Sequence, residues 1–215
     1  MHTRRPAFLF DLDGTLLDSR GDLADAANAA RAALGLPPLS DEAVERHTGW
    51  GMAALLAGVV PEATPEMLVR AREVFIPYYQ KHLLKRSPPY PRVEEMFEAL
   101  AGHPLGLVTN KPAMFTVPIV EALGWNRHFG VVVSGDTTPQ RKPAPEPLLH
   151  GLAALGVAPA EAIFVGDTPI DAETARNAGV RFIAVPWGRV AVGGVDAVAG
   201  VQTVAHLPDL ARFRV

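Results

Sequence analysis

The stretch spanning residues 7–19 constrains the fold of this chain more than any other part of the sequence. It begins with a short apolar run, Ala7–Phe10, which stops abruptly at two acidic residues, Asp11 and Asp13. A continuous apolar run of this length is typical of a strand that is buried on both faces of a parallel sheet. Open α/β sheets bind their ligands beyond the carboxyl ends of the strands, so we expect both carboxylates to lie where such sheets place their chemistry.

The spacing of Asp11 and Asp13 adds a second constraint. Side chains alternate along an extended segment, so these two carboxylates point to the same side. They repel each other unless a cation, a shared proton or a basic side chain lies between them. Gly14 then frees the backbone to turn and to approach a ligand closely. A strand followed by an Asp-Gly turn is also a common structural pattern, so this stretch alone does not decide the function.

Composition excludes several classes of protein. With 215 residues, 48% of them hydrophobic, the chain can bury a full core as one domain or as a domain with an insertion. The net charge of −3, with no basic stripe, predicts neither nucleic-acid nor membrane binding. The absence of cysteine excludes disulfides, thiolate zinc sites and cysteine nucleophiles. No secretory signal and no apolar run of about 18 residues is seen, which predicts a soluble, cytoplasmic protein.

The segment 17–87 carries only helical patterns, so we predict a helical insertion after the first strand. Apolar side chains recur there at helical spacing, and no strand pattern is found. Pro77 lies inside one pattern and is expected to kink or split that helix. The predicted helices run from Leu23 to Leu34, from the N-cap Ser40, from Met52 to Val59, and from the cap pair Thr64–Pro65 toward Leu84.

The rest of the chain alternates strands with helices, which favours a doubly wound parallel sheet with right-handed crossovers. We therefore predict an α/β core built from residues 1–16 and 88–215. Its further strands are expected at Leu105–Val108, Val131–Val133, Ala162–Val165, Arg181–Val185 and within Val195–Val204. Its helices are expected at Val93–Leu100, Phe115–Leu123, Pro145–Leu155, Asp171–Ala178 and His206–Phe213.

Polar residues follow three of these strands. Thr109, Asn110 and Lys111 come after one, Asp167 and Asp171 after another, and Lys142 lies in the loop after a third. Because parallel strands bring their carboxyl ends to one edge of the sheet, these side chains are predicted to converge with the acids of the first strand.

Carboxylates without thiolates or clustered histidines make an oxygen-only site suited to Mg²⁺. Such a site favours a ligand that brings its own negative oxygens, namely a phosphoryl group. Lys142 and the donors at Thr109 and Asn110 can neutralise its charge. A carboxylate can itself attack phosphorus and form an aspartyl-phosphate. Each residue also has an ordinary structural role, as a helix cap or a solvated charge, so the convergence carries the functional interpretation.

The motifs support a family resemblance. Asp11-Leu-Asp-Gly-Thr15, Val108-Thr-Asn110, Lys142-Pro143 and Gly166-Asp-Thr-Pro-Ile-Asp171 resemble, in order, the four motifs of the haloacid dehalogenase superfamily. The neighbouring residues 109–112, 135–136, 142–148 and 165–167 are most similar to the phosphoglycolate phosphatase branch. The insertion at 17–87 resembles that family's small cap domain. The resemblance implies a Rossmann-like core with an inserted α-helical cap.

The resemblance also implies roles for individual residues. Asp11 would be the nucleophile and a Mg²⁺ ligand, and Asp167 a second ligand. Asp13 would protonate the leaving alcohol, activate the hydrolytic water and touch the metal through its backbone carbonyl. Thr109 and Lys142 would hold the phosphoryl oxygens.

Four further positions would support the site. Asn110 would help through its backbone, Asp171 would support the metal directly or through water, and Gly14 and Thr15 complete the first motif. The fourth motif reads Gly-Asp-Thr-Pro where this branch commonly has Ser after the Asp, so Pro169 bears on the placement of Asp171.

Substrate specificity is expected to come from the cap. Trp50, between two glycines, matches the family's substrate-facing cap loop. A substrate carboxylate needs a cation or donor, and Lys111, Arg20 and His47 are the candidates; the sequence does not choose among them.

The predicted function is a Mg²⁺-dependent phosphomonoesterase for a small phosphorylated metabolite, with 2-phosphoglycolate as the first choice. The alternatives are a phosphomutase of the β-phosphoglucomutase type and a non-catalytic regulator that binds Mg²⁺ or phosphate. Dehalogenase chemistry is disfavoured because that branch lacks the second acid of the first motif, and Asp13 is present. A monomer and a homodimer are both compatible with the sequence.

Overall fold

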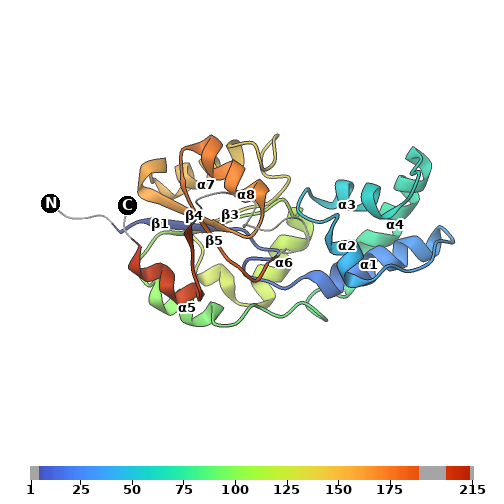
Figure 1. Ribbon diagram of the computed structural model, residues 1–215, viewed down its shortest axis with the longest axis horizontal. Coiled ribbons are helices and arrows are strands. Elements are labelled where there is room, and N and C mark those ends of the chain that lie inside the picture. The colour runs from blue at the N-terminus through green and yellow to red at the C-terminus, as the bar shows by residue number, and fades with distance from the viewer. Residues whose placement is uncertain (1–4, 189–201, 214–215) are drawn as a thin grey trace. The chain divides into compact units, whose positions relative to one another are not determined.

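The computed structural model describes residues 5–188 and 202–213. The chain forms two compact units (Figure 1). The core unit comprises the chain up to Leu17 and again from Pro89, and the helical unit is Asp18–Pro88.

The core unit is built on a parallel sheet, as predicted. Among the described residues the strands lie in the order β3-β2-β1-β4-β5-β6, and every pairing is parallel. The central strand β1 therefore pairs with β2 on one side and β4 on the other. The bounds are β1 Ala7–Phe10, β2 Leu105–Val108, β3 Val131–Val133, β4 Ala162–Gly166, β5 Arg181–Ala184 and β6 Gln202–Thr203.

Helices cover both faces of this sheet. Figure 1 shows α7 and α8 on one side of the strands and α5 on the other. The α-helices of the core unit are α5 Val93–Ala99, α6 Ala113–Ala122, α7 Glu146–Leu155 and α8 Pro169–Ala178. The described 3₁₀ helices are η1 Trp125–Arg127, η2 Pro159–Glu161 and η5 Leu207–Arg212.

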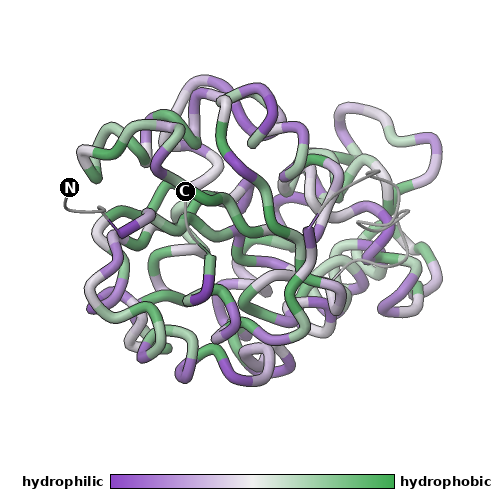
Figure 2. Tube along the Cα trace, turned by 60° about the vertical axis from the view of Figure 1, so that its left-hand side comes forward, coloured by the Kyte–Doolittle hydropathy of each residue, from purple (hydrophilic) through white to green (hydrophobic). Residues whose placement is uncertain are grey.

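The apolar runs of the sequence form the middle of the sheet because both of their faces are covered. Every residue of β1, β2 and β4 is buried. Figure 2 shows hydrophobic stretches of chain, coloured green, in the interior of the core unit. Leu9 and Phe164 on the sheet pack in one cluster with Leu148 and Leu152 of α7 and Ala175 of α8. This packing fixes the positions of the carboxyl ends of the strands, and the polar motifs directly follow those ends.

The helical unit contains four α-helices in which α1 packs against α2, α3 and α4. Ser40 and Thr64 cap two of them as predicted, since their side chains accept hydrogen bonds from the backbone N–H groups of Ala43 (3.2 Å) and Met67 (3.3 Å). The bounds are α1 Arg20–Ala33, α2 Asp41–Glu45, α3 Met52–Val59 and α4 Pro65–Lys81. No helix among residues 5–188 and 202–213 is long and apolar enough to cross a bilayer.

Pro77 does not split its helix, which corrects one alternative of the prediction. Helix α4 continues through Pro77 to Lys81. Ala71, Phe75 and Tyr79 form its buried side, and the burial of such a face stabilises the helix more than the missing proline N–H destabilises it.

Smaller differences concern element ends. Helices α6 and α8 each begin two residues before the predicted start, and the closing helix is 3₁₀ rather than α. The strand expected within 195–204 is seen as Gln202–Thr203, and residues 195–201 of that prediction lie outside the described residues.

Candidate active site

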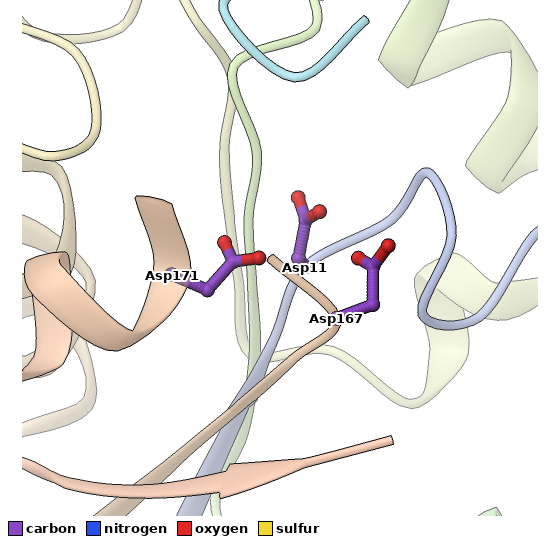
Figure 3. A group of neighbouring side chains, drawn as sticks. All are labelled: Asp11, Asp167 and Asp171. Carbon is purple, nitrogen blue, oxygen red and sulfur yellow. The ribbon is translucent and has the colours of Figure 1, made fainter. Parts of the chain in front are cut away.

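Three carboxylates converge at the carboxyl edge of the sheet (Figure 3). Asp11 follows β1, Asp167 follows β4, and Asp171 lies in the first turn of α8. One oxygen from each carboxylate lies within 4.8 Å of the others, and all three residues are buried. This convergence was predicted from the polar residues at the strand ends.

Lys142 lies among these acids. Its Nζ is 2.8 Å from Oδ1 of Asp11 and 2.7 Å from Oδ1 of Asp171, and its side chain is 2% exposed. The backbone of Lys142 is fixed as well, because the side chain of Asn110 accepts a hydrogen bond from its N–H and donates one to its carbonyl, both at 3.0 Å. Asn110 thus ties the loop after β3 to the end of β2, a side-chain contact that the sequence did not reveal.

The electrostatics of this cluster follow from burial and crowding. Burial raises the pKa of the Asp11 carboxyl above its ordinary value, Lys142 opposes the rise, and Asp171 and Asp13 add to it. Burial also disfavours the charged form of Lys142, but Asp11 and Asp171 outweigh that effect, so the pKa of Lys142 is raised and its ammonium form is favoured. Asp11 and Asp171 therefore share one buried ammonium group, that of Lys142.

Asp171 is held on both oxygens by protein donors. Its Oδ1 accepts from Lys142, and its Oδ2 accepts from the N–H (3.0 Å) and the Oγ1 (2.5 Å) of Thr168. Thr168 is the N-cap of α8 and Pro169 is its first residue, a position that proline fills well. The Thr-Pro departure in the fourth motif therefore builds a reciprocal cap that orients Asp171 toward Lys142.

Asp167 is enclosed by two glycines. Thr15 donates to its Oδ1 at 3.0 Å. A Cβ added to Gly14 would lie 2.2 Å from its Oδ2, and one added to Gly188 would lie 2.2 Å from its Cβ. Trp187 donates from Nε1 to the carbonyl of Thr15 (3.3 Å). Sequence analysis missed Trp187 and Gly188, although they follow β5 at the same edge of the sheet.

Asp13 lies outside the three-acid cluster and has its own cation. The Nζ of Lys111 is 2.8 Å from Oδ1 and 2.9 Å from Oδ2 of Asp13. Thr109 is buried: its N–H donates to the carbonyl of Val133 of β3 (2.9 Å), and its Oγ1 accepts from the N–H of Lys111 (3.2 Å).

The remaining candidates belong to the helical unit. Arg20 pairs with Asp18 at 2.6 Å, His47 lies against Gly58, and Trp50 is 53% exposed. Their assignment to substrate binding stays a prediction.

The donor set fits a divalent cation. Asp11, Asp167 and Asp171 offer only carboxylate oxygens, which are the ligands that Mg²⁺ and Ca²⁺ prefer. With Asp13 included, four buried carboxylates face two buried ammonium groups, so an excess of negative charge is left for a cation. Buried charges of one sign are costly unless they are paired or coordinate a metal.

Comparison with known proteins identifies the class. The sequence matches the family of haloacid dehalogenase-like hydrolases over residues 8–185, and the chain belongs to that family. Within it, this hydrolase is phosphoglycolate phosphatase-like. It is 41% identical to the phosphoglycolate phosphatase of Chromobacterium violaceum over 95% of each chain, and 38% identical to that of Thiobacillus denitrificans over 85% of this chain and 83% of the relative.

Two more relatives are similar to this chain over most of its length. The N-acetylmuramic acid 6-phosphate phosphatase of Pseudomonas aeruginosa is 38% identical over 95% of this chain and 92% of its own length. A crystal structure of a predicted phosphoglycolate phosphatase from Haemophilus somnus superposes with a TM-score of 0.88 at 30% identity over 98% of both chains.

Proposed function

We propose that this chain is a Mg²⁺-dependent phosphomonoesterase that hydrolyses 2-phosphoglycolate to glycolate and phosphate. The observation that carries the proposal is the buried cluster in which Lys142 contacts Asp11 and Asp171, with Asp167 completing the acid group. Similarity to phosphoglycolate phosphatases over 95% of the chain supports the choice of substrate.

Asp11 is the proposed nucleophile. One of its carboxylate oxygens attacks phosphorus, the bond from phosphorus to the ester oxygen breaks, and an aspartyl-phosphate forms on Asp11. Asp13 gives its proton to the departing ester oxygen. It then takes a proton from the water that attacks the aspartyl-phosphate, which releases phosphate and restores Asp11. Lys142 and Thr109 hold the phosphoryl oxygens through this sequence.

Asp11 and Asp167 would hold the metal through side-chain oxygens, and Asp13 would add its backbone carbonyl. A bound Mg²⁺ would neutralise charge on the phosphoryl group and on the acids around it. Asp171, with both oxygens engaged by Lys142 and Thr168, acts by orienting Lys142.

A second substrate has a specific observation in its favour. The N-acetylmuramic acid 6-phosphate phosphatase is similar to this chain over nearly the same length as the phosphoglycolate phosphatases. A phosphomonoester panel that contains 2-phosphoglycolate, N-acetylmuramic acid 6-phosphate and β-glucose 1-phosphate, ranked by kcat/KM with and without Mg²⁺, separates these substrates. A mutase would turn the sugar phosphate into an isomer and release little phosphate.

Asp11→Asn is the direct test of the reaction. Phosphate release from 2-phosphoglycolate is expected to fall by about 10³-fold or more, because an amide does not replace the nucleophile. The matched control is Glu173→Gln, which removes an exposed carboxylate from α8 in the same unit and should leave turnover unchanged. Unaltered turnover in Asp11→Asn with Mg²⁺ would refute the assigned nucleophile. Cytoplasmic location and the oligomeric state stay predictions.

A further inference from the structure

Lys111 and Asp13 form a buried ion pair that the proposed chemistry does not yet explain. The ammonium group of Lys111 donates to both carboxylate oxygens of Asp13, at Nζ–O distances of 2.8 and 2.9 Å. The side chains are 3% and 12% exposed. The sequence suggested a different role for Lys111, as a candidate to bind a substrate carboxylate.

Stability alone is a poor reason for this pair. Removing two charges from water costs free energy that their attraction often fails to recover, so a buried ion pair is weak evidence of stabilisation. Lysines normally extend their ammonium group to solvent. The main chain of Lys111 is held by the hydroxyl of Thr109 and by the N–H of Gly135, so the segment that places a phosphoryl-binding residue also places this lysine.

The position of Asp13 in the first motif indicates what its contact with Lys111 does. Asp13 precedes the turn at Gly14, which is closed by a hydrogen bond from the N–H of Gly14 to the carbonyl of Leu17 (2.9 Å). Burial is the main cause of the raised pKa of Asp11, and the negative charge of Asp13 adds to that rise. Asp13 is two residues from Asp11 in the chain, and Lys111 contacts both oxygens of the Asp13 carboxylate.

We propose that Lys111 is a positioning residue that holds the Asp13 carboxyl group toward the leaving-group oxygen and keeps it apart from the metal-binding acids. This inference rests on the proposed function, because it assumes that Asp13 serves the departing ester oxygen. The ammonium stem of a lysine is flexible. Lys111 can therefore keep one Asp13 oxygen while the other carries the proton that passes to the departing ester oxygen.

The test uses leaving groups of different basicity. Ethyl phosphate and 2-phosphoglycolate release basic alkoxides that need a proton, whereas 4-nitrophenyl phosphate releases a stable phenolate that needs little help. In Lys111→Met, kcat for the two alkyl esters is expected to fall by about 10²-fold, the size of a general-acid contribution. The fall for 4-nitrophenyl phosphate should stay below about 10-fold, and KM should change by less than about threefold for all three. Lys111→Arg should restore part of the alkyl-ester rate.

Two further variants make the result decisive. Asp13→Asn sets the reference, because it should show the same dependence on the leaving group. Arg176→Met removes an exposed positive charge from α8 of the same unit and should leave kcat unchanged for every ester. Thermal unfolding of each variant reports whether it is folded, and Lys111→Gln carries the comparison if Lys111→Met does not fold.

Failure of the inference is distinguishable from failure of the proposed function. If Asp13→Asn slows all esters equally, the role proposed for Asp13 is wrong, and the role of Lys111 falls with it. If Asp13→Asn is selective for alkyl esters but Lys111→Met slows all three equally, Lys111 does not position Asp13. A rise in KM confined to 2-phosphoglycolate, with kcat unchanged, would instead assign Lys111 to the substrate carboxylate and overturn the inference.

Discussion

Lys142 and Lys111 are both buried beside acids at the carboxyl edge of the sheet, but the charge around them differs. Lys142 contacts two acids, and Asp167 lies within reach of the same group, so acids outnumber the cation. Lys111 faces Asp13, and that pair is balanced. The unbalanced cluster has capacity for a divalent cation, while the balanced pair does not attract one. This difference agrees with the proposal that the first cluster binds the metal and the phosphoryl group, and that Asp13 of the second pair serves the departing ester oxygen.

Among the variants that test this difference between the two lysines, Lys142→Met is expected to lower the activity most. It leaves Asp11 and Asp171 without their shared cation and removes the group proposed to hold the phosphoryl oxygens. We expect kcat/KM to fall by about 10²- to 10³-fold for alkyl and nitrophenyl esters alike, in contrast to the selective loss in Lys111→Met.

Steady-state kinetics on ethyl and 4-nitrophenyl phosphate measure this contrast. Unfolding in urea should show a loss of about 3–5 kcal/mol in the metal-free protein, because buried charges are left unpaired. A loss confined to alkyl esters would place Lys142 with the acid-base group and remove the distinction between the two lysines.

A smaller effect is expected from Gly188→Ala, which tests whether the acid cluster around Lys142 binds the metal independently of the Lys111–Asp13 pair. The new Cβ would collide with Asp167 and displace it, because the three atoms nearest to that Cβ all belong to the Asp167 side chain. We expect the Mg²⁺ concentration for half-maximal activity to rise by about 10-fold or more, the usual result of disturbing a ligand's support.

Two measurements check this prediction. One is the Mg²⁺ activation curve, and the other is the Mg²⁺-induced rise in Tm, which should be smaller in the variant. Pro186→Ala alters an exposed neighbour in the same loop and is the control. A variant that binds Mg²⁺ as tightly as the wild type would show that Asp167 does not depend on this glycine.

Much of the fold could be predicted because apolar runs and strand-end polarity are local signals. The run Ala7–Phe10 is apolar throughout since β1 is covered on both faces, and it lies between β2 and β4. The continuity of α4 through Pro77 could not be predicted, because it depends on the burial of Phe75 and Tyr79 in the helical unit rather than on local propensity.

For the site, the convergence of the acids could be predicted, but the partners of individual side chains could not. The convergence of Asp11, Asp167 and Asp171 follows from the rule that parallel strands share one edge. The partners of individual side chains are set by contacts distant in sequence. Nothing local to Lys111 indicates Asp13, 98 residues earlier. The same rule also places Gly188 at this edge of the sheet, because it follows β5. Its role could not be predicted, because a glycine has no functional group and the space that it leaves for Asp167 becomes apparent only in the structure.

A crystal structure with Mn²⁺ and beryllium trifluoride tests the central claim most directly, because the anomalous signal locates the cation and the fluoride group reports the phosphoryl position. The account predicts Mn²⁺ between Asp11 and Asp167, beryllium trifluoride on the Asp11 carboxylate, Lys142 and Thr109 at its fluorine atoms, and Lys111 on Asp13. A cation held by the Asp13 carboxylate, or beryllium trifluoride bound away from Asp11, would contradict it.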